Sequence, residues 1–133
     1  IKVLATDINS RMVARAAEGI YANDTARDVP VALLRRWFSA SKDSSGNSVW
    51  RASEELRSLV SFRQLNLADT WPFTGVFDVI FCRNVAIYFD QATQDKLWMR
   101  LANQLAPNGR LYIGHSERIG GPACGLLRPD GTT

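Results

Sequence analysis

The sequence is poor in the residues that build metal centres and disulfide frameworks. It has a single histidine, His115, and two cysteines, Cys82 and Cys124, which do not form a ligand-spaced cluster. A protein metal centre needs several such ligands held together, so no metal site is predicted. Two cysteines in a chain of 133 residues do not indicate a disulfide framework, and a cytoplasmic location is the default expectation.

Long hydrophobic runs and strong charge are also missing. No apolar run approaches the roughly 18 residues of a membrane span, so direct membrane insertion is not expected. The formal net charge is +3, and Arg35 and Arg36 form the only adjacent basic pair. Basic residues dispersed in this way are typical of a solvated surface, so nucleic acid is not expected as a partner.

What the chain has in quantity is apolar sequence, in short segments. Hydrophobic residues make up 46% of it, which is ordinary for a globular protein, and its length is that of one domain. Strand-like apolar runs are followed by amphipathic helical patterns, as in an α/β fold. We expect a single domain over residues 1–133.

The apolar run Phe77–Cys82 predicts a strand that is buried on both faces. Arg83 and Asn84 end this run, and Tyr88 follows a few residues later. Ligands of open α/β sheets bind at the carboxyl ends of the strands, so these three residues are candidates for function. The alternative, which spacing alone leaves open, is that Arg83 caps a sheet edge and Asn84 turns the chain.

Two other predicted strands, Ile1–Ala5 and Phe62–Leu65, are also followed by polar residues. Asp7 comes after the first, and a carboxylate there can accept hydrogen bonds from both hydroxyls of a ribose. It can equally be a charge that favours the start of the next helix. Asn66 after the second strand could bond an adenine edge, with Leu67 as an apolar wall, or could bond its own backbone in a loop.

Two longer helices are predicted where a capping residue precedes apolar residues at helical spacing. Asn9 or Ser10 caps the first, and its apolar face extends to Ile20. Asp90 caps the second, which the stop signal Pro107-Asn108-Gly109 ends before a short strand around Leu111-Tyr112-Ile113. The apolar face of this second helix comprises Leu97, Trp98, Leu101 and Leu105.

Residues 24–62 interrupt the α/β pattern and are predicted to form a small inserted subdomain. Pro30 can start a short helix whose apolar face ends at Phe38. After a polar loop, Val49-Trp50-Arg51 can return as a strand against the segment around Phe38. Ser53 then caps another brief helix.

Four stretches together resemble the CheR family of chemotaxis-receptor glutamate methyltransferases. They are ATDINSRMVARAAEGIY, LNLADTWPF, FDVIFCRNVAIYFD and GRLYIGHSE, in this order along the chain. The resemblance covers nearly the whole sequence. It implies a Rossmann-like α/β fold that binds S-adenosylmethionine (SAM), with S-adenosylhomocysteine (SAH) as the product.

The resemblance also implies roles for individual residues. The matching positions for cofactor binding are Asp7, Asn66, Leu67, Arg83 and Asn84, and those for catalysis are Arg83 and Tyr88. The implied reaction is methylation of glutamate side chains on the cytoplasmic domain of methyl-accepting chemotaxis receptors. The insertion at 24–62 would then be the β-subdomain that docks on the receptor.

The sequence departs from the family at its ends. The glycine-rich turn and first strand of the methyltransferase fold do not precede Ile1, so we expect a partial fold, truncated at both ends. In it, residues 1–7 should pair with 62–66, and 77–82 with 109–115. The strand edges left open would favour either direct pairing of strands 1–7 and 77–82 or an edge-paired or strand-exchanged dimer. Either outcome implies weak or no SAM binding by the isolated chain.

Two other functions compete with this interpretation. A non-catalytic interaction or sensing module could keep the same scaffold without the cofactor site. A nucleic-acid methyltransferase is less favoured, because Arg83-Asn84-Val85-Ala86 lacks the Asn-Pro-Pro-aromatic signature of the amino-methylating enzymes. His115 is interpreted as a hydrogen-bonded structural residue rather than a catalytic one, since the sequence suggests no partner for it.

Overall fold

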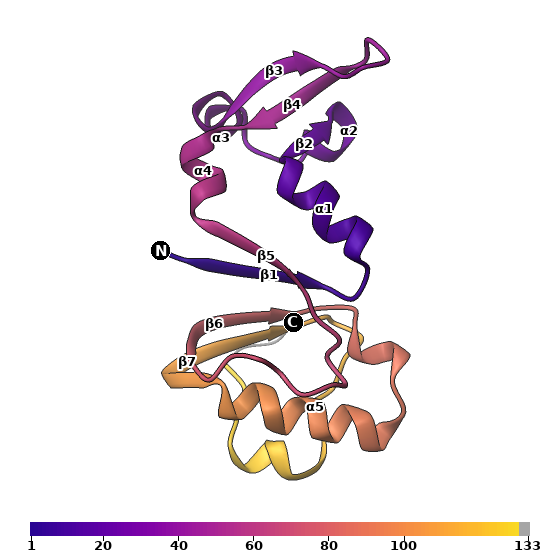
Figure 1. Cartoon of the computed structure of the whole chain (residues 1–133). Helices are drawn as coiled ribbons and strands as arrows, with labels where there is room; N and C mark the ends of the chain where they lie inside the picture. The colour runs from indigo at the N-terminus through magenta and orange to yellow at the C-terminus, as the bar shows by residue number, and fades with distance from the viewer. Residues whose placement is uncertain (131–133) are drawn as a thin grey trace. The chain divides into compact units, whose positions relative to one another are not determined.

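The structure is a computed structural model that describes residues 1–130 (Figure 1). The chain divides into two compact units, a first unit, Ile1–Asn66, and a second unit that begins at Leu67. Both combine helices with strands, and each contains one pair of parallel strands. The fold is a mixed α/β fold with parallel strands, consistent with a partial Rossmann-like methyltransferase fold, as the sequence predicts.

In the first unit, strand β1 (Val3–Asp7) lies parallel to strand β5 (Val60–Gln64). The register runs from Val3 opposite Val60 to Asp7 opposite Gln64, and the Leu65 N–H donates to the Asp7 carbonyl at 2.9 Å. This confirms the predicted pairing. Strand β5 begins and ends slightly earlier than the apolar pattern indicates.

Helix α1 (Ser10–Glu18) follows β1, and its N-cap is Asn9, whose side chain accepts a hydrogen bond from the Arg11 N–H. The helix ends at Gly19, which has a φ of 65°. Glycine adopts this left-handed conformation without steric cost, so it stops the helix there. The prediction that Ile20 belongs to the helix is therefore wrong.

The rest of the first unit is an antiparallel sheet in the order β2-β4-β3, with short helices around it. Pairing of Phe38 with Ala52 confirms the predicted hairpin, although Phe38 starts a strand instead of ending a helix. The carboxylate of Asp43 fixes the hairpin loop by accepting from the Ser45 and Asn47 N–H groups, both at 2.9 Å. The elements are β2 (Ile20–Ala22), α2 (Asn23–Ala26), α3 (Val31–Trp37), β3 (Phe38–Lys42), β4 (Ser48–Ala52) and α4 (Glu54–Ser58).

The second unit is built on parallel strands β6 (Phe77–Cys82) and β7 (Leu105–Ile113), as predicted. Helix α5 (Gln91–Asn103) connects them, with the short 3-10 helix η1 (Ala86–Tyr88) before it. Another 3-10 helix, η2 (Gly121–Gly125), lies in the glycine-rich tail. Residues 131–133 of that tail lie outside the described residues.

Helix α5 ends earlier than predicted. The helix stops at Asn103, and Leu105, which was assigned to its apolar face, is the first residue of β7. The Phe77 N–H donates to the carbonyl of Gln104 at 2.7 Å, so pairing with β6 begins immediately after the helix. Sheet formation thus stops the helix before the signal at Pro107-Asn108-Gly109 is reached.

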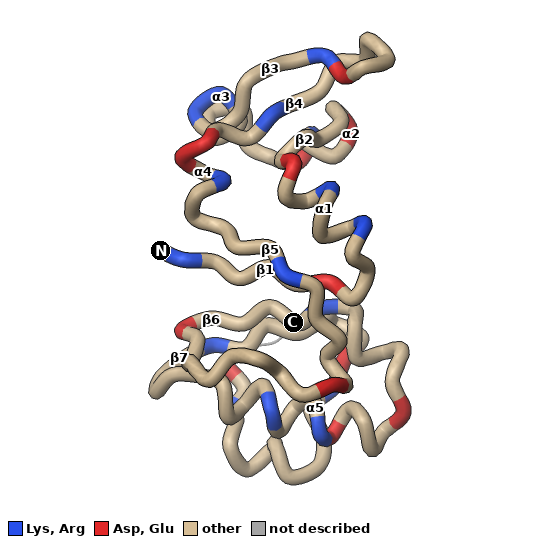
Figure 2. Tube along the Cα trace, in the orientation of Figure 1, with Lys and Arg blue, Asp and Glu red and all other residues tan. Residues whose placement is uncertain are grey.

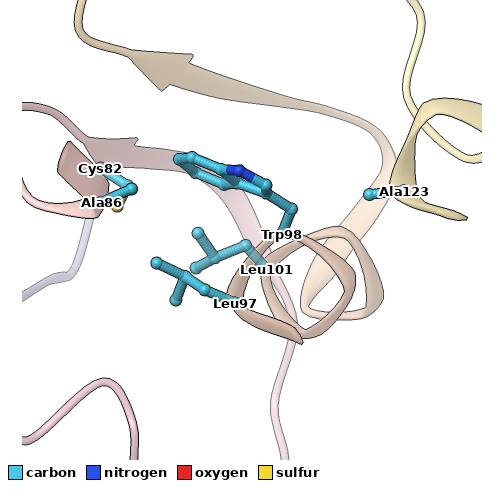
Figure 3. Close-up of a cluster of buried hydrophobic side chains, with 6 residues drawn as sticks. All are labelled: Cys82, Ala86, Leu97, Trp98, Leu101 and Ala123. Atoms are coloured by element: carbon cyan, nitrogen blue, oxygen red, sulfur yellow. The ribbon is translucent and has the colours of Figure 1, made fainter. Parts of the chain in front are cut away.

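The core of the second unit lies on one face of the β6-β7 sheet. Trp98 and Leu97 of α5 are 0% and 2% exposed, and the Cys82 side chain from β6 is also buried. On the opposite face Phe81 is 72% exposed and stacks on Tyr112, with ring centroids 4.9 Å apart. The prediction that β6 is buried on both faces is wrong, because α5 packs on one face only. Figure 3 shows the core residues Cys82, Ala86, Leu97, Trp98, Leu101 and Ala123.

Among the described residues, each of the two parallel sheets has two strands. Strand β1 has β5 as its partner, and β6 has β7. The expected dimer and the weak cofactor binding of the isolated chain stay predictions. None of the described helices has the length and apolar character needed to cross a membrane.

The N-cap of α5 makes stability depend on pH. The Asp90 carboxylate accepts a hydrogen bond from the Thr93 N–H at 2.8 Å. This bond, a second one with the Thr93 side chain and the charge of Lys96 lower the pKa of Asp90. A carboxyl group with a lowered pKa stabilises the fold above its unfolded-state pKa and loses this contribution as pH falls through the folded-state pKa.

We therefore expect Asp90→Ala to lower the urea midpoint of unfolding at neutral pH, because the helix loses its cap. The difference from wild type should persist above the ordinary aspartate pKa of about 3.9, which applies to the unfolded state, and should shrink as pH falls further through the lowered pKa of folded Asp90. Asp28→Ala, which removes an exposed carboxylate from a turn, is the matched control. A difference that is the same at all pH values would contradict the capping role of the charge.

Candidate functional site

In the first unit, Asp7 and Asn66 lie at the carboxyl ends of the paired strands β1 and β5. The Asp7 side chain is held by a local turn, since Oδ1 accepts from the Asn9 N–H at 2.7 Å. The Gln64 side chain donates to the Ile8 carbonyl at 2.9 Å and fixes the same turn from the neighbouring strand. The hydrogen bond from Asn9 orients the Asp7 carboxylate, and its exposed position makes it accessible to a ligand.

The remaining candidates belong to the second unit. Leu67 is half-buried against the core, and its carbonyl accepts from Trp71 Nε1 at 3.3 Å and Arg100 Nη1 at 3.0 Å. The Arg100 guanidinium lies over the Trp71 ring, 4.1 Å from its centroid. These contacts hold the backbone of Leu67 in place, and its side chain packs against the hydrophobic core of the second unit.

Arg83, Asn84 and Tyr88 lie on the turn at the carboxyl end of β6 and on the short helix that follows it. Arg83 is the first residue after the strand, and Asn84 has a φ of 58°, which reverses the chain. The 3-10 helix η1 then begins at Ala86 and ends at Tyr88. The side chains of Arg83 and Tyr88 are exposed, Tyr88 to 81%.

A buried carboxylate that sequence reasoning missed holds this turn. Glu117 is 3% exposed and lies shortly after β7. Its carboxylate accepts four backbone N–H groups: Gly114 at 2.6 Å, Ala86 at 2.8 Å, and Asn84 and Val85 at 2.9 Å each. No side-chain pattern signals this site, because every partner is a backbone amide.

The hydrogen bonds to Glu117 keep its charge. Burial raises the pKa of the Glu117 carboxyl, but the four backbone N–H donors outweigh burial, and the pKa lies below its ordinary value. Burial and the nearby Glu117 charge together raise the pKa of the Cys82 thiol to about 11. Cys82 is thus a neutral core residue, as predicted, and is not suited to act as a thiolate nucleophile.

Gly114 leaves room for this arrangement. A Cβ at this position would lie 2.5 Å from Asn84 Oδ1 and 2.8 Å from Glu117 Oε2. Both distances are too short for a carbon atom, so a side chain here would displace the carboxylate or the turn. The glycine that precedes His115 therefore has a packing reason to be there.

His115 itself is exposed, and its carbonyl accepts a hydrogen bond from Arg118 at 2.7 Å. The interpretation of His115 as a hydrogen-bonded structural residue rather than a catalytic one stays a prediction. Among residues 1–130, no cluster of three or more histidine, cysteine or acidic side chains is arranged to hold a metal ion. Lysine and arginine are spread over most elements (Figure 2).

Comparison with known proteins identifies the family. The model of the family described as "CheR methyltransferase, SAM binding domain" matches residues 1–124. The chain belongs to the CheR methyltransferase family. The match is to the SAM-binding domain of this family, which confirms S-adenosylmethionine as the cofactor and agrees with the predicted fold.

Individual CheR-family relatives support this assignment. A probable chemotaxis protein methyltransferase of Rhizobium etli is 45% identical over 92% of this chain and 45% of its own length. Chemotaxis protein methyltransferase 2 of Pseudomonas aeruginosa is 40% identical, covering 90% of this chain and 42% of the relative. The Escherichia coli chemotaxis protein methyltransferase is 40% identical over 89% of this chain and 41% of its own. The chain therefore spans less than half the length of these curated relatives.

Each unit, taken by itself, has groups whose chemistry fits part of a SAM-type ligand. In the first unit, Asp7 has an exposed, turn-held carboxylate that can accept hydrogen bonds from ribose hydroxyls. In the second unit, Leu67 has an apolar, half-buried side chain on a fixed backbone. Asn66, Arg83 and Asn84, the other residues predicted to bind the cofactor, also lie at strand ends.

Proposed function

We propose that the protein containing this chain transfers a methyl group from SAM to glutamate side chains of chemotaxis receptors. The products are a glutamate γ-methyl ester and SAH. The observation that carries the proposal is the turn after β6 in a SAM-binding domain. Arg83 at the start of this turn and Tyr88 at the end of the following helix η1 both have exposed side chains. An exposed arginine at this end of a sheet strand is suited to hold a substrate carboxylate.

The reaction needs alignment more than acid–base chemistry. A glutamate carboxyl has an ordinary pKa of about 4.3, so the nucleophile is already ionised at neutral pH and no general base is required. The cofactor supplies an electrophilic methyl group: the carboxylate oxygen forms the new O–C bond while the S–C bond breaks and its electron pair stays on sulfur. Fixing the reacting groups in line can contribute about 7–11 kcal/mol to lowering the barrier in well-oriented systems.

Arg83 and Tyr88 are proposed to supply this alignment. The planar guanidinium of Arg83 can bind both oxygens of a carboxylate and so fixes its orientation. The hydroxyl of Tyr88 can donate a hydrogen bond near the reacting oxygen. Because a positive sulfonium and a negative carboxylate become neutral groups, exclusion of water by the bound substrate would assist the reaction.

The remaining parts of the proposal concern partners and organisation. We propose that residues 1–133 act as one SAM-methyltransferase domain in which 24–62 form an inserted subdomain. The hairpin β3-β4 within this subdomain is proposed to dock on the cytoplasmic domain of the receptor. The reaction would then occur in the cytoplasm. The names of the relatives, which are chemotaxis protein methyltransferases, support this choice of substrate.

The proposal is tested on the full-length protein with two measurements. Calorimetric titration with SAH should show binding, and incubation with radiolabelled SAM and receptor should label the receptor with methyl groups. Mild base should release this label as methanol, because carboxyl methyl esters hydrolyse easily and methylated amines do not. Binding of SAH without labelled receptor, or no binding at all, would contradict the proposal and favour a non-catalytic module.

We expect Tyr88→Phe to lower kcat for receptor methylation by about three- to tenfold, the effect of losing one neutral hydrogen bond. The dissociation constant for SAH should stay unchanged, since the variant keeps the aromatic ring and the backbone. Tyr112→Phe, which removes the hydroxyl of a tyrosine on the exposed face of the β6-β7 sheet, is the matched control. A Tyr88→Phe protein with wild-type turnover at saturating substrate would remove Tyr88 from the active site.

A further inference from the structure

Glu117 lies beneath the proposed active-site turn without being exposed to a substrate. It is 3% exposed, and each carboxylate oxygen accepts two hydrogen bonds from backbone N–H groups. Three of the four donors are the successive amides of Asn84, Val85 and Ala86. A single side chain therefore fixes three consecutive peptide groups that are more than thirty residues away in the sequence.

The backbone conformation of the turn explains why a carboxylate is needed there. Asn84 is left-handed, with a φ of 58°, and Val85 is right-handed, with φ −117° and ψ −47°. Alternating left- and right-handed residues point successive N–H groups into one concavity that binds anions. The Glu117 carboxylate fills this concavity and offsets the strain of a non-glycine residue at positive φ.

The held segment connects the two residues proposed to orient the substrate. Arg83 immediately precedes the first bound amide, and the third bound amide, that of Ala86, begins the helix η1 that ends at Tyr88. Gly114 contributes the fourth amide. Because it has no side chain, the carboxylate can lie close to Asn84, where a Cβ would clash with both residues. Movement of this carboxylate would therefore move both Arg83 and Tyr88.

We propose that Glu117 is a positioning residue for methyl transfer, which sets the orientation of Arg83 and Tyr88 through the backbone of residues 84–86. This inference rests on the proposed function. Glu117 does not touch the substrate in this proposal; it acts through the turn. Loss of the Glu117 carboxylate should lower turnover, because the turn would no longer hold Arg83 and Tyr88 in position.

The central variant is Glu117→Gln in the full-length protein. Glutamine has the same shape, but its amide NH2 group would face backbone donors, so the four bonds cannot all be made. We expect kcat at saturating SAM and receptor to fall by about tenfold. Hydrogen exchange of the amides of residues 84–86 should become faster. Glu18→Gln, at an exposed position at the end of α1, is the control with the same chemical change and should behave as wild type.

A double-mutant cycle separates positioning from a general loss of structure. If Glu117 acts through Arg83, then Glu117→Gln should lower kcat by less than about threefold when Arg83 is already alanine. Should Glu117→Gln fail to fold, Glu117→Asp keeps the charge with a shorter reach and is measured in the same cycle. The aspartate variant is expected to lie between wild type and Glu117→Gln in both turnover and amide exchange.

Each outcome decides the inference. Faster amide exchange with kcat within about twofold of wild type would show a structural role only and would overturn it. An effect of Glu117→Gln that is undiminished in both the Arg83→Ala and the Tyr88→Phe backgrounds would overturn it too, because Glu117 would then act independently of both residues. A wild-type protein that binds SAH but methylates no receptor would overturn the proposed function and this inference with it.

Discussion

Replacing Arg83 by alanine in the full-length protein is expected to lower kcat for receptor methylation by about a hundredfold. The dissociation constant for SAH should change much less. The reason is that the proposed role of the Arg83 guanidinium is to orient the substrate carboxylate, and alignment is the main source of catalysis available when the nucleophile is already ionised. The exposed position of Arg83 directly after β6 is what gives it access to a substrate.

Two variants make this result specific. Arg83→Lys keeps the positive charge but loses the planar pair of donors, so it should remain closer to Arg83→Ala than to wild type. Arg128→Ala, which removes an exposed arginine from the tail, should keep full activity. If Arg83→Ala turned over at the wild-type rate at saturating receptor, Arg83 could not be the group that orients the substrate.

The sequence predicted the parts of the fold that depend on local chemistry. The caps at Asn9, Ser53 and Asp90 each accept the expected backbone N–H, and the strand pairs β1-β5 and β6-β7 match the proposed pairing. These features follow from residue types within a few positions of one another, or from the order of strands that the family motifs imply. The places where polar residues end the strands were predictable for the same reason.

Features decided by distant contacts were not predictable in this way. The apolar sequence of β6 gives no sign that the face carrying Phe81 stays exposed, because that depends on which elements pack on the sheet. The early end of α5 depends on pairing between Phe77 and the chain after the helix. Glu117 was missed because its partners are backbone amides, which carry no sequence signal of their own.

The site is thus of two kinds. Asp7 in the first unit, and Arg83 and Tyr88 in the second, are exposed residues that carry the proposed chemistry. Strand position made them candidates, and the family resemblance supplied their roles. Glu117 and Gly114 carry none of it, yet they decide where the turn after β6 lies. A homologous sequence that kept the first group and changed the second would be expected to retain cofactor binding and to lose turnover.

The second large effect is expected at Asp7. Asp7→Ala in the full-length protein should weaken SAH binding by about ten- to a hundredfold, because hydrogen bonds to a charged acceptor contribute about 1.5–3 kcal/mol each. The carboxylate is exposed at the end of β1, where one oxygen is oriented by the Asn9 N–H and the group can still accept ribose hydroxyls. Isothermal titration calorimetry of both proteins measures the difference directly.

Asp7 also has a local structural role, and two controls separate it from ligand binding. Asp7→Asn keeps an oxygen that can accept from the Asn9 N–H but loses the charge, so it should bind SAH more weakly than wild type with an unchanged unfolding midpoint. Asn9→Ala removes the cap of α1 and leaves the carboxylate of Asp7, so it should lower stability and keep most of the affinity. If Asn9→Ala weakened binding as much as Asp7→Ala, the effect would come from the turn, and Asp7 would not be a ribose ligand.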